Sequence, residues 1–308
     1  MCFNHGHTHH APAVTTPAVA TPKISRRNMV KAGGAAVAAA GLTACATNAE
    51  TGRKQFLAFA PGEAQLSQAA GASWDELKKT TPTSRDPRYT GRLQTIGNRI
   101  SRGAGRHDQQ WEYTVFDQDT LNAFVLPGNR VGFYKGMMDF ADNDDQIAGI
   151  MGHEVGHVSG SHARERYSLQ VASQAAVVGT AVIGGTALSR KCNSVPAEQR
   201  SSCLNNANRN TQYLVQAIGL GAQIGLVLPY SRRHETESDL LGANYAYRAG
   251  YDPYQSVRLW EKMAERNQNR PPEFLSTHPD PTNRAQTLHD YIKRQEALGS
   301  QGFKSIAT

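Results

Sequence analysis

Several features that are common in larger proteins are missing from this chain of 308 residues. No interior segment contains 18 uninterrupted apolar residues, so the hydropathy pattern predicts no transmembrane helix. The basic residues are scattered and are not interleaved with aromatic residues, which argues against nucleic-acid binding. There is no internal repeat and no tetratricopeptide-like tail, which excludes a solenoid.

Cysteine is scarce, with four residues in the whole chain. Cys2 lies in an N-terminal leader and Cys45 ends it, which leaves Cys192 and Cys203. In an oxidising compartment an even pair is most simply a disulfide, which would close a short loop in the polar segment 191–210. A metal site at this pair is disfavoured, because the spacing is not CxxC and no His is near.

Acidic residues are absent from residues 1–44, a segment rich in Pro, Thr and Ala that cannot build a core. The pair Arg26-Arg27 before a short apolar run at 32–41 indicates an export signal of the twin-arginine type. A start at Met29 would instead leave a short Sec-type signal. The apolar run is too short for a convincing membrane anchor.

The leader ends in the sequence LTAC, which resembles a bacterial lipobox. Cleavage before Cys45 would leave a lipid-modified residue that anchors the chain to the periplasmic side of an envelope membrane. Ala46 follows in place of Asp, which by resemblance to sorted lipoproteins favours the outer membrane. Four His between His5 and His10 could bind metal, but they precede the cleavage site. The predicted organisation is a signal peptide at 1–44, a membrane tether at 45–60 and one folded domain at 61–308.

The most informative motif present is HEVGH at residues 153–157. On a helix, residues four apart lie about 40° apart around the axis and about 6 Å along it. His153 and His157 can therefore reach one ion, while Glu154 would flank the metal as a general base. The motif predicts a hydrolytic site with one Zn²⁺ per chain that still needs a third protein ligand.

The third ligand could come from two places. In the metzincin arrangement a His falls six residues after the second one, but that position is Ala163 and His162 is one residue early. Further along the chain, Glu235 and Asp239 would share one helix face, whereas Glu237 would point elsewhere. Glu235 could complete a His₂Glu set, and Asp239 could orient a ligating His. An ordinary charged helix face is the alternative for this pair.

Four ordered motifs over roughly residues 111–290 carry a family resemblance. They are NAFVLPG from residue 122, HEVGH from 153, SRxxExxxDxxG from 231, and STHP from 276 followed by Arg284. This order is similar to the zinc metallopeptidase family that contains the CAAX prenyl proteases and HtpX. The layout resembles most its soluble periplasmic lipoprotein members.

The resemblance implies a three-ligand zinc site made of His153, His157 and Glu235. It also implies that Glu154 is the general base and that His278 and Arg284 help to stabilise the oxyanion. The departures are mild, since Ser238 stands where the family often has Ala and the zinc helix is rich in small residues. Neither departure removes a ligand.

The pattern predicts an α+β, mostly helical fold, a zincin-like domain with a small sheet beside the HExxH helix. Helical spacing is seen at 62–79 and 86–103, and β-forming clusters at 112–116, 123–126 and 130–134. Further helices are expected from Ser231, from about 250 to 267 and from 282 to 298, with His278 in a loop at 271–282. The strand beside the zinc helix could pair with a substrate backbone, or it could simply cover the core.

Two further expectations concern the helices. Asp144 or Asp145 is expected to cap the zinc helix. Two Ala- and Gly-rich helices near 165–187 and 210–228 are expected to pack in the core, although they are apolar enough to lie against lipid or a partner.

Together these features predict a zinc endopeptidase that cleaves misfolded or membrane-associated envelope proteins, with assembly machinery or other proteases as further partners. One alternative is a non-proteolytic assembly lipoprotein with a structural zinc. A structural zinc usually has four protein ligands, and Glu154 would then have no task. Another alternative is a latent enzyme in which Arg233-His234 or the loop with His278 occupies the open coordination position.

Overall fold

The computed structural model describes residues 45–222, 228–266, 273–278 and 281–304. The chain forms two units, residues 1–43 and 44–308, and the second unit contains every described element. The predicted signal peptide at 1–44 lies outside the described residues.

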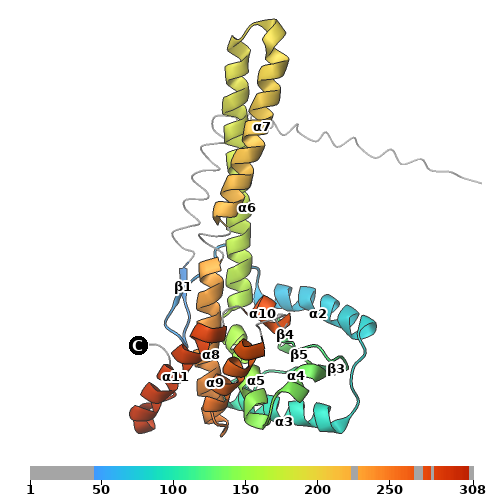
Figure 1. The fold of residues 1–308 in the computed structure, drawn as a ribbon, viewed down its shortest axis with the longest axis vertical. Coiled ribbons are helices and arrows are strands. Elements are labelled where there is room, and N and C mark those ends of the chain that lie inside the picture. The colour runs from blue at the N-terminus through green and yellow to red at the C-terminus, as the bar shows by residue number, and fades with distance from the viewer. Residues whose placement is uncertain (1–44, 223–227, 267–272, 279–280, 305–308) are drawn as a thin grey trace, which may run out of the picture. The chain divides into compact units, whose positions relative to one another are not determined.

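A small sheet beside a buried helix forms the centre of the unit (Figure 1). The strands are β3 (Glu112–Phe116), β4 (Ala123–Leu126) and β5 (Arg130–Tyr134), with the spans predicted from the sequence. Their order is β3-β5-β4, with β3 parallel and β4 antiparallel to β5, so β4 is an edge strand. The predicted α+β, mostly helical architecture is confirmed.

The central helix α5 (Asp144–Ser159) carries the HEVGH motif and is buried along almost its whole length. Its N-cap is Asn143, whose side chain accepts a hydrogen bond from the Gln146 backbone N–H at 2.9 Å. The predicted cap at Asp144 or Asp145 is therefore wrong. These two residues lie in the first turn, where a negative charge is favourable beside the helix dipole.

Helix α8 (Leu228–Arg248) packs directly against α5. The contact is so close that a Cβ added to Gly242 would lie 2.8 Å from the backbone N of His153. A Cβ on Gly152 would meet the carbonyl oxygen of Gly242 at the same distance. The small residues of α5 therefore let α8 approach its backbone.

The remaining helices enclose this centre. They are α2 (Glu63–Thr80), α3 (Pro87–Gly103), α4 (Lys135–Phe140), α9 (Tyr254–Arg266), α10 (Glu273–Thr277) and α11 (Pro281–Ala297), with a 3₁₀ turn η3 at Gly299–Gln301. The loop predicted at 271–282 is wrong for 273–277, which form α10 directly before His278. Residues 271–272 and 279–280 of that loop lie outside the described part.

The segment predicted as a tether at 45–60 is folded onto the domain. It forms an antiparallel hairpin of β1 (Cys45–Thr47) and β2 (Lys54–Phe56). Asn48 Nδ2 donates a hydrogen bond to the carbonyl of Ser159 at 2.8 Å, and Gln55 donates one to the carbonyl of Gly160. These buried bonds satisfy the C-terminal carbonyls of α5, so the hairpin packs against the end of that helix.

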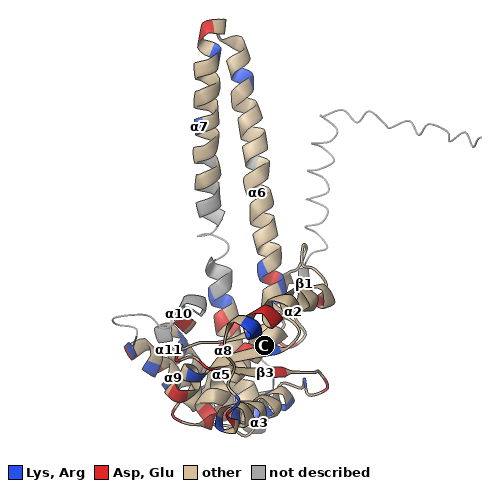
Figure 2. Ribbon diagram, turned by 90° about the vertical axis from the view of Figure 1, so that its right-hand side faces the viewer, with Lys and Arg blue, Asp and Glu red and all other residues tan. Residues whose placement is uncertain are grey.

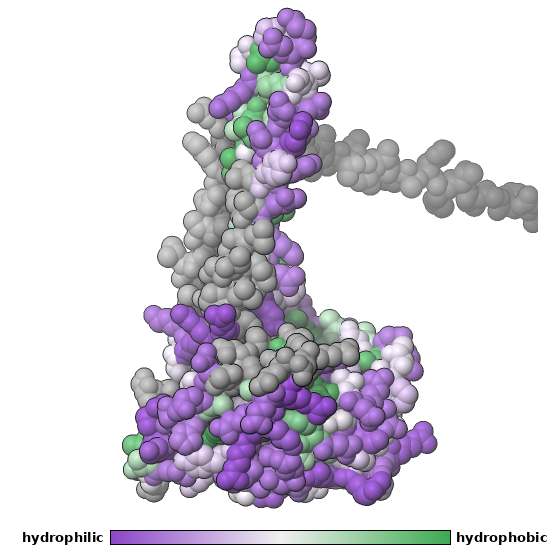
Figure 3. All heavy atoms as spheres, in the orientation of Figure 1, coloured by the Kyte–Doolittle hydropathy of each residue, from purple (hydrophilic) through white to green (hydrophobic). Residues whose placement is uncertain are grey.

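Helices α6 (His162–Lys191) and α7 (Ala197–Ala222) pack against each other as a long pair that leads away from the sheet (Figures 1 and 2). A 3₁₀ turn η1 (Cys192–Ser194) lies at the tip, where Cys192 and Cys203 are joined with a Cα–Cα distance of 5.6 Å. These helices were expected in the core. Instead, the apolar part of α6 is exposed, with Val182 at 61% (Figure 3).

Candidate metal centre

Four buried side chains bring their ligand-type atoms within 4.8 Å of one another: His153, His157, Glu235 and His278. The first two project from α5, Glu235 from α8, and His278 follows α10. The Nε2 atoms of His153 and His157 are 3.1 Å apart. Glu235 places Oε2 at 3.4 Å from the first Nε2 and Oε1 at 3.6 Å from the second.

The chemistry of this donor set fits a divalent metal ion. Glu235 Oε1 is buried and has no hydrogen-bond partner, although a buried acceptor is costly to leave unpaired. Burial by itself would raise the pKa of Glu235, but hydrogen bonds from His153 and His278 hold it far below its usual value. A carboxylate that stays ionised beside converging imidazole nitrogens favours a cation between them.

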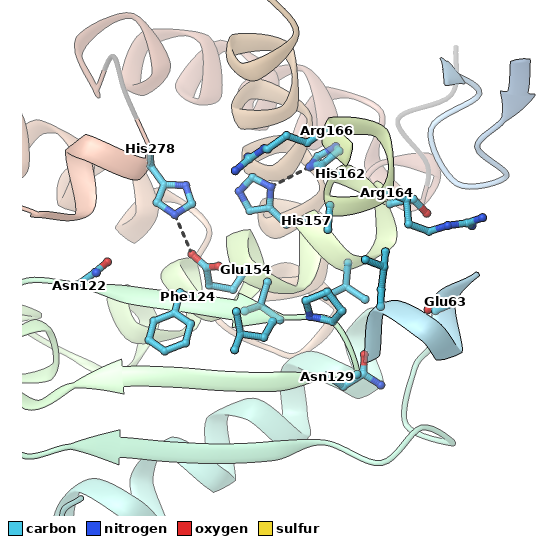
Figure 4. A pocket seen from close by; sticks show the side chains of 18 residues that line it. Glu63, Asn122, Phe124, Asn129, Glu154, His157, His162, Arg164, Arg166 and His278 are labelled. Atoms are coloured by element: carbon cyan, nitrogen blue, oxygen red, sulfur yellow. Dashed lines mark hydrogen bonds and ion pairs between the residues drawn. The ribbon is translucent and has the colours of Figure 1, made fainter. Parts of the chain in front are cut away.

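Glu154 lies next to this cluster without belonging to it. Its carboxyl group is buried, and Oε1 is 3.5 Å from His278 Nε2 (Figure 4). Burial raises the pKa of Glu154 above its usual value. A carboxyl with a raised pKa beside a metal-type cluster suits a group that accepts and returns a proton.

A cavity of about 360 Å³ opens over Glu154 and His157. One wall is the edge strand β4 with the turn that follows it, from Phe124 to Asn129. Another wall carries Arg164 and Arg166 from the start of α6 (Figure 4). The cavity is therefore bounded by a strand edge on one side and by basic side chains on another.

Comparison with known proteins identifies the domain. The model of Peptidase family M48 matches residues 87–292, which include all four clustered side chains. The chain belongs to peptidase family M48. This finding confirms the predicted zincin-like fold, and residues 87–292 carry the metalloendopeptidase domain of the family.

Three relatives illustrate the range of M48 proteins that resemble this chain. Mitochondrial metalloendopeptidase OMA1 of Schizosaccharomyces pombe is 28% identical over 65% of the chain and 52% of its own length. The beta-barrel assembly-enhancing protease of Escherichia coli K12 is 26% identical over 68% of the chain and 40% of its own length. Metalloprotease LoiP of the same organism is 25% identical over 78% of the chain and 85% of its own length. The chain thus spans about half of the length of the OMA1 relative and less than half of the length of the beta-barrel assembly-enhancing protease.

In this M48 domain, His153 is oriented by Asp239 and Arg284. His153 Nδ1 lies 2.8 Å from Asp239 Oδ1, which turns Nε2 towards the cluster. Arg284 donates from Nε and Nη2 to both oxygens of Asp239 at 2.7 Å. Burial would raise the pKa of Asp239, but Arg284 lowers it below the usual range, so the carboxylate stays charged. The predicted pairing of Asp239 with a His is present. Arg284 does not line the cavity itself, but its Nη1 lies 3.3 Å from the carbonyl oxygen of His278 and 3.4 Å from Glu235 Oε2.

His157 is oriented by a residue that the sequence prediction did not assign. Its Nδ1 lies 2.8 Å from His162 Nδ1, and His162 Nε2 lies 3.0 Å from Glu237 Oε2. Burial lowers the pKa of His162 to about 4, although Glu237 opposes this shift. The neutral ring can therefore accept from His157 and donate to Glu237.

A break in the helix brings His162 to His157. Five residues apart on a continuous helix, the two rings would point in different directions. The chain ends α5 at Ser159 and starts α6 at His162, and Ser161 adopts the left-handed conformation with φ of 52°. The sequence signal for this arrangement is His162, which directly follows the helix-breaking segment Ser-Gly-Ser at 159–161.

The network extends to the β1–β2 hairpin. Arg53 forms ion pairs with Glu237 at 2.6 Å and with Glu165 at 2.7 Å. His234 Nε2 lies 2.9 Å from Glu165, and its ring stacks on His162 with centroids 4.1 Å apart. The alternative in which His234 occupies the open coordination position is therefore wrong, because its Nε2 faces Glu165.

Proposed function

We propose that the protein is a zinc-dependent endopeptidase held in the bacterial envelope. The observation that carries this proposal is the buried cluster of His153, His157 and Glu235 with Glu154 beside it but outside the ligand set. These three residues would hold the ion. A bound Zn²⁺ supplies Lewis-acid chemistry, since it polarises a carbonyl oxygen and acidifies water.

The chain's own groups move the proton and orient the ligands. Glu154 would take a proton from the attacking water and return it to the leaving amine, a role that its raised pKa supports. Asp239 fixes the Nδ1–H tautomer of His153, and His162 fixes that of His157. Without these bonds each imidazole could rotate away from the cluster.

The edge strand β4 supports a substrate in extended conformation. It pairs with β5 on one side and lines the cavity with residues 124–126. A peptide that added to this edge would pass Glu154, and such strand addition requires an unfolded or locally extended chain. Misfolded or membrane-associated proteins are therefore the proposed substrates.

The proposed location rests on the lipobox-like sequence before Cys45 and on the relatives. One relative is named as a protease that enhances the assembly of β-barrels, which supports envelope proteins as substrates and assembly machinery as a partner. Lipid attachment to Cys45 and placement at the outer membrane are part of this proposal.

A second candidate is a latent form of the same enzyme. His278 Nδ1 lies 2.8 Å from Glu235 Oε2, and the ring lies 3.1 Å from His153 Nε2. His278 is thus positioned among the ligand-type atoms as well as 3.5 Å from Glu154. A ring in this place can block the open coordination position, whereas an oxyanion donor would have to turn towards the substrate.

The variant His278→Ala separates the two roles. If His278 stabilises the oxyanion, its loss lowers kcat by about 10²–10³-fold. If His278 holds the enzyme latent, its loss raises peptidase activity.

The test of the proposed function is cleavage of an unfolded protein by residues 46–308 with and without Glu154→Gln. We expect one zinc ion per chain in both proteins and a loss of about 10²–10⁴ in rate for the variant. The control is Glu63→Gln, which changes a carboxylate at the rim of the same cavity and should leave the rate unchanged. A zinc-loaded parent and a zinc-loaded His278→Ala variant that both fail to cleave would support the non-proteolytic alternative.

A further inference from the structure

Helix α6 has a long section without charge. Residues 167–189 contain no Asp, Glu, Lys, Arg or His, and at 1.5 Å per residue they extend about 35 Å. The hydrocarbon core of a bilayer is about 30 Å thick. The helix His162–Ser194 is the one helix in the described part of the chain that is long and apolar enough to cross a membrane.

Helix α6 is neither a core helix of a soluble protein nor a signal sequence. A core helix would be buried, but none of the apolar 18-residue window of α6 is buried. A signal sequence would lie near the N-terminus, whereas α6 lies in the middle of the chain. Val178, Val182 and Ile183 are 60–64% exposed and lie within two turns of one another, and contiguous exposed apolar residues mark a contact with protein or membrane.

The apolar residues surround the axis of α6 and do not form one stripe. Val178 and Val182 lie on one side, and Val177 and Ile183 are displaced around the helix by about 100° from them. A helix that lies flat on a membrane has a polar face, whereas one that is apolar on all sides is buried in protein or in lipid. Since α6 is exposed, lipid is the environment that its composition fits.

The second arm continues the same pattern. Asn210–Ala222 of α7 also contains no charged residue. A Cβ on Gly185 would lie 3.5 Å from Thr211 Cγ2, so this part of α7 lies beside the charge-free part of α6. Each helix satisfies its own backbone hydrogen bonds, as a segment that enters lipid must.

The charged residues of α6 lie at its two ends (Figure 2), and Arg209 of α7 directly precedes the charge-free section 210–222. Arg164 and Arg166 lie at the base, and Arg190 and Lys191 lie near the tip. Basic side chains at these places can reach the headgroups on either side of a bilayer. The polar tip at 190–209, with the Cys192–Cys203 bond, would remain outside the hydrocarbon.

We propose that the α6–α7 pair inserts into a lipid bilayer, with residues 167–189 and 210–222 in the hydrocarbon core. This contact is independent of a lipid on Cys45 and of peptidase activity. Because Arg164 and Arg166 also line the cavity, insertion would hold the cavity at the level of the headgroups.

The test uses residues 46–308, which are the second unit shortened by two residues. This protein lacks the leader and Cys45, so it cannot carry the proposed lipid. We expect this protein to float with vesicles of phosphatidylethanolamine and phosphatidylglycerol and to remain bound in 1 M NaCl. Val182→Asp should lower the partition coefficient about 60-fold, the change that corresponds to roughly 2.5 kcal/mol for a charge at a helix centre. Circular dichroism should show that the helices of the variant are retained.

The matched control is Leu298→Asp, since Leu298 is 56% exposed on the domain and Val182 is 61% exposed on α6. It should leave vesicle binding unchanged. The proposal is overturned if the parent stays in solution, if salt releases it, or if the two variants bind equally. It is also overturned if Val182→Asp abolishes only self-association, since a second copy would then cover this face.

Discussion

His162 links the metal-type cluster to a second buried network. It lies 2.8 Å from His157 on one side and 3.0 Å from Glu237 on the other. Because a ligating imidazole is held by the partner of its second nitrogen, His162 should act on metal affinity without touching the ion.

We expect His162→Phe to raise the dissociation constant of zinc about 10–100-fold, since the ring is retained but the acceptor is lost. The measurement is competition with a chromophoric chelator. The control is His234→Phe, which preserves the ring stacked on His162 and removes the bond to Glu165 instead. Equal affinities of the two variants would contradict the role of His162.

Glu165 is a second residue whose chemistry depends on its surroundings. Burial would raise its pKa, but His234 and Arg53 lower it to about 2, from the usual value of 4.5. The folded state thus binds fewer protons than the unfolded state between these values. Stability is present above pH 4.5 and is lost as the pH falls towards 2.

The stability of the variant Glu165→Gln should therefore not show this decrease between pH 4.5 and 2. At neutral pH its free energy of unfolding should be lower than that of the parent by roughly 3 kcal/mol. Urea unfolding between pH 2.5 and 7 measures both effects. The exposed Glu198→Gln serves as the control. A parent whose stability does not fall below pH 4.5 would show that Glu165 is not held as an anion.

At the scale of elements, the distance between α5 and α8 determines how closely the ligand-type side chains of the two helices approach one another. Glu235 and Asp239 reach His153 because the two backbones meet at Gly152 and Gly242. Any atom added there must separate the helices and with them the ligands.

We expect Gly242→Ala to cost about 1–3 kcal/mol of stability and to weaken metal binding, because its Cβ would meet backbone atoms of α5. Denaturant unfolding checks the first effect and chelator competition the second. Gly91→Ala is the control, since nothing lies within 4 Å of its Cβ and the helix should gain about 1 kcal/mol. If Gly242→Ala behaved like the control, the close contact would have no structural role.

Local patterns predicted the strands and most helices, since period and turn residues determine them. The HEVGH spacing and the Glu235–Asp239 spacing likewise predicted residues that the fold brings together, because each pair lies on one helix. The contact of His162 with His157 could not be predicted, since it depends on the left-handed Ser161.

The prediction for α6 was wrong for a different reason. Its Ser, Thr and Gln residues interrupt every apolar run, so a search for 18 uninterrupted apolar residues passes over it, although its mean hydropathy is high enough for a membrane span. The exposure of Val178 and Val182 is a property of the tertiary structure, and it reverses the expectation that this helix is packed in the core.

For the whole molecule, the metal should contribute to stability, because an ion that binds only the folded state stabilises it by mass action. Removing zinc with a chelator should lower the free energy of unfolding by about 3–4 kcal/mol where zinc exceeds its dissociation constant 100- to 1,000-fold. Calorimetry would record a Tm lower by roughly 5–15 °C, restored by added zinc. A loss of activity with no change in Tm would place the ion outside the buried cluster.

Arg53 gives the N-terminal segment a part in the integrity of the site. It is the partner of Glu237 and Glu165, both buried beside the ring that holds His157. A shortened protein that began at residue 61 would contain every motif of the family, yet it would leave two buried carboxylates without this counter-charge. The catalytic domain and the hairpin that precedes it therefore form one structural unit. A substitution of Arg53 should weaken metal binding through Glu237 and His162.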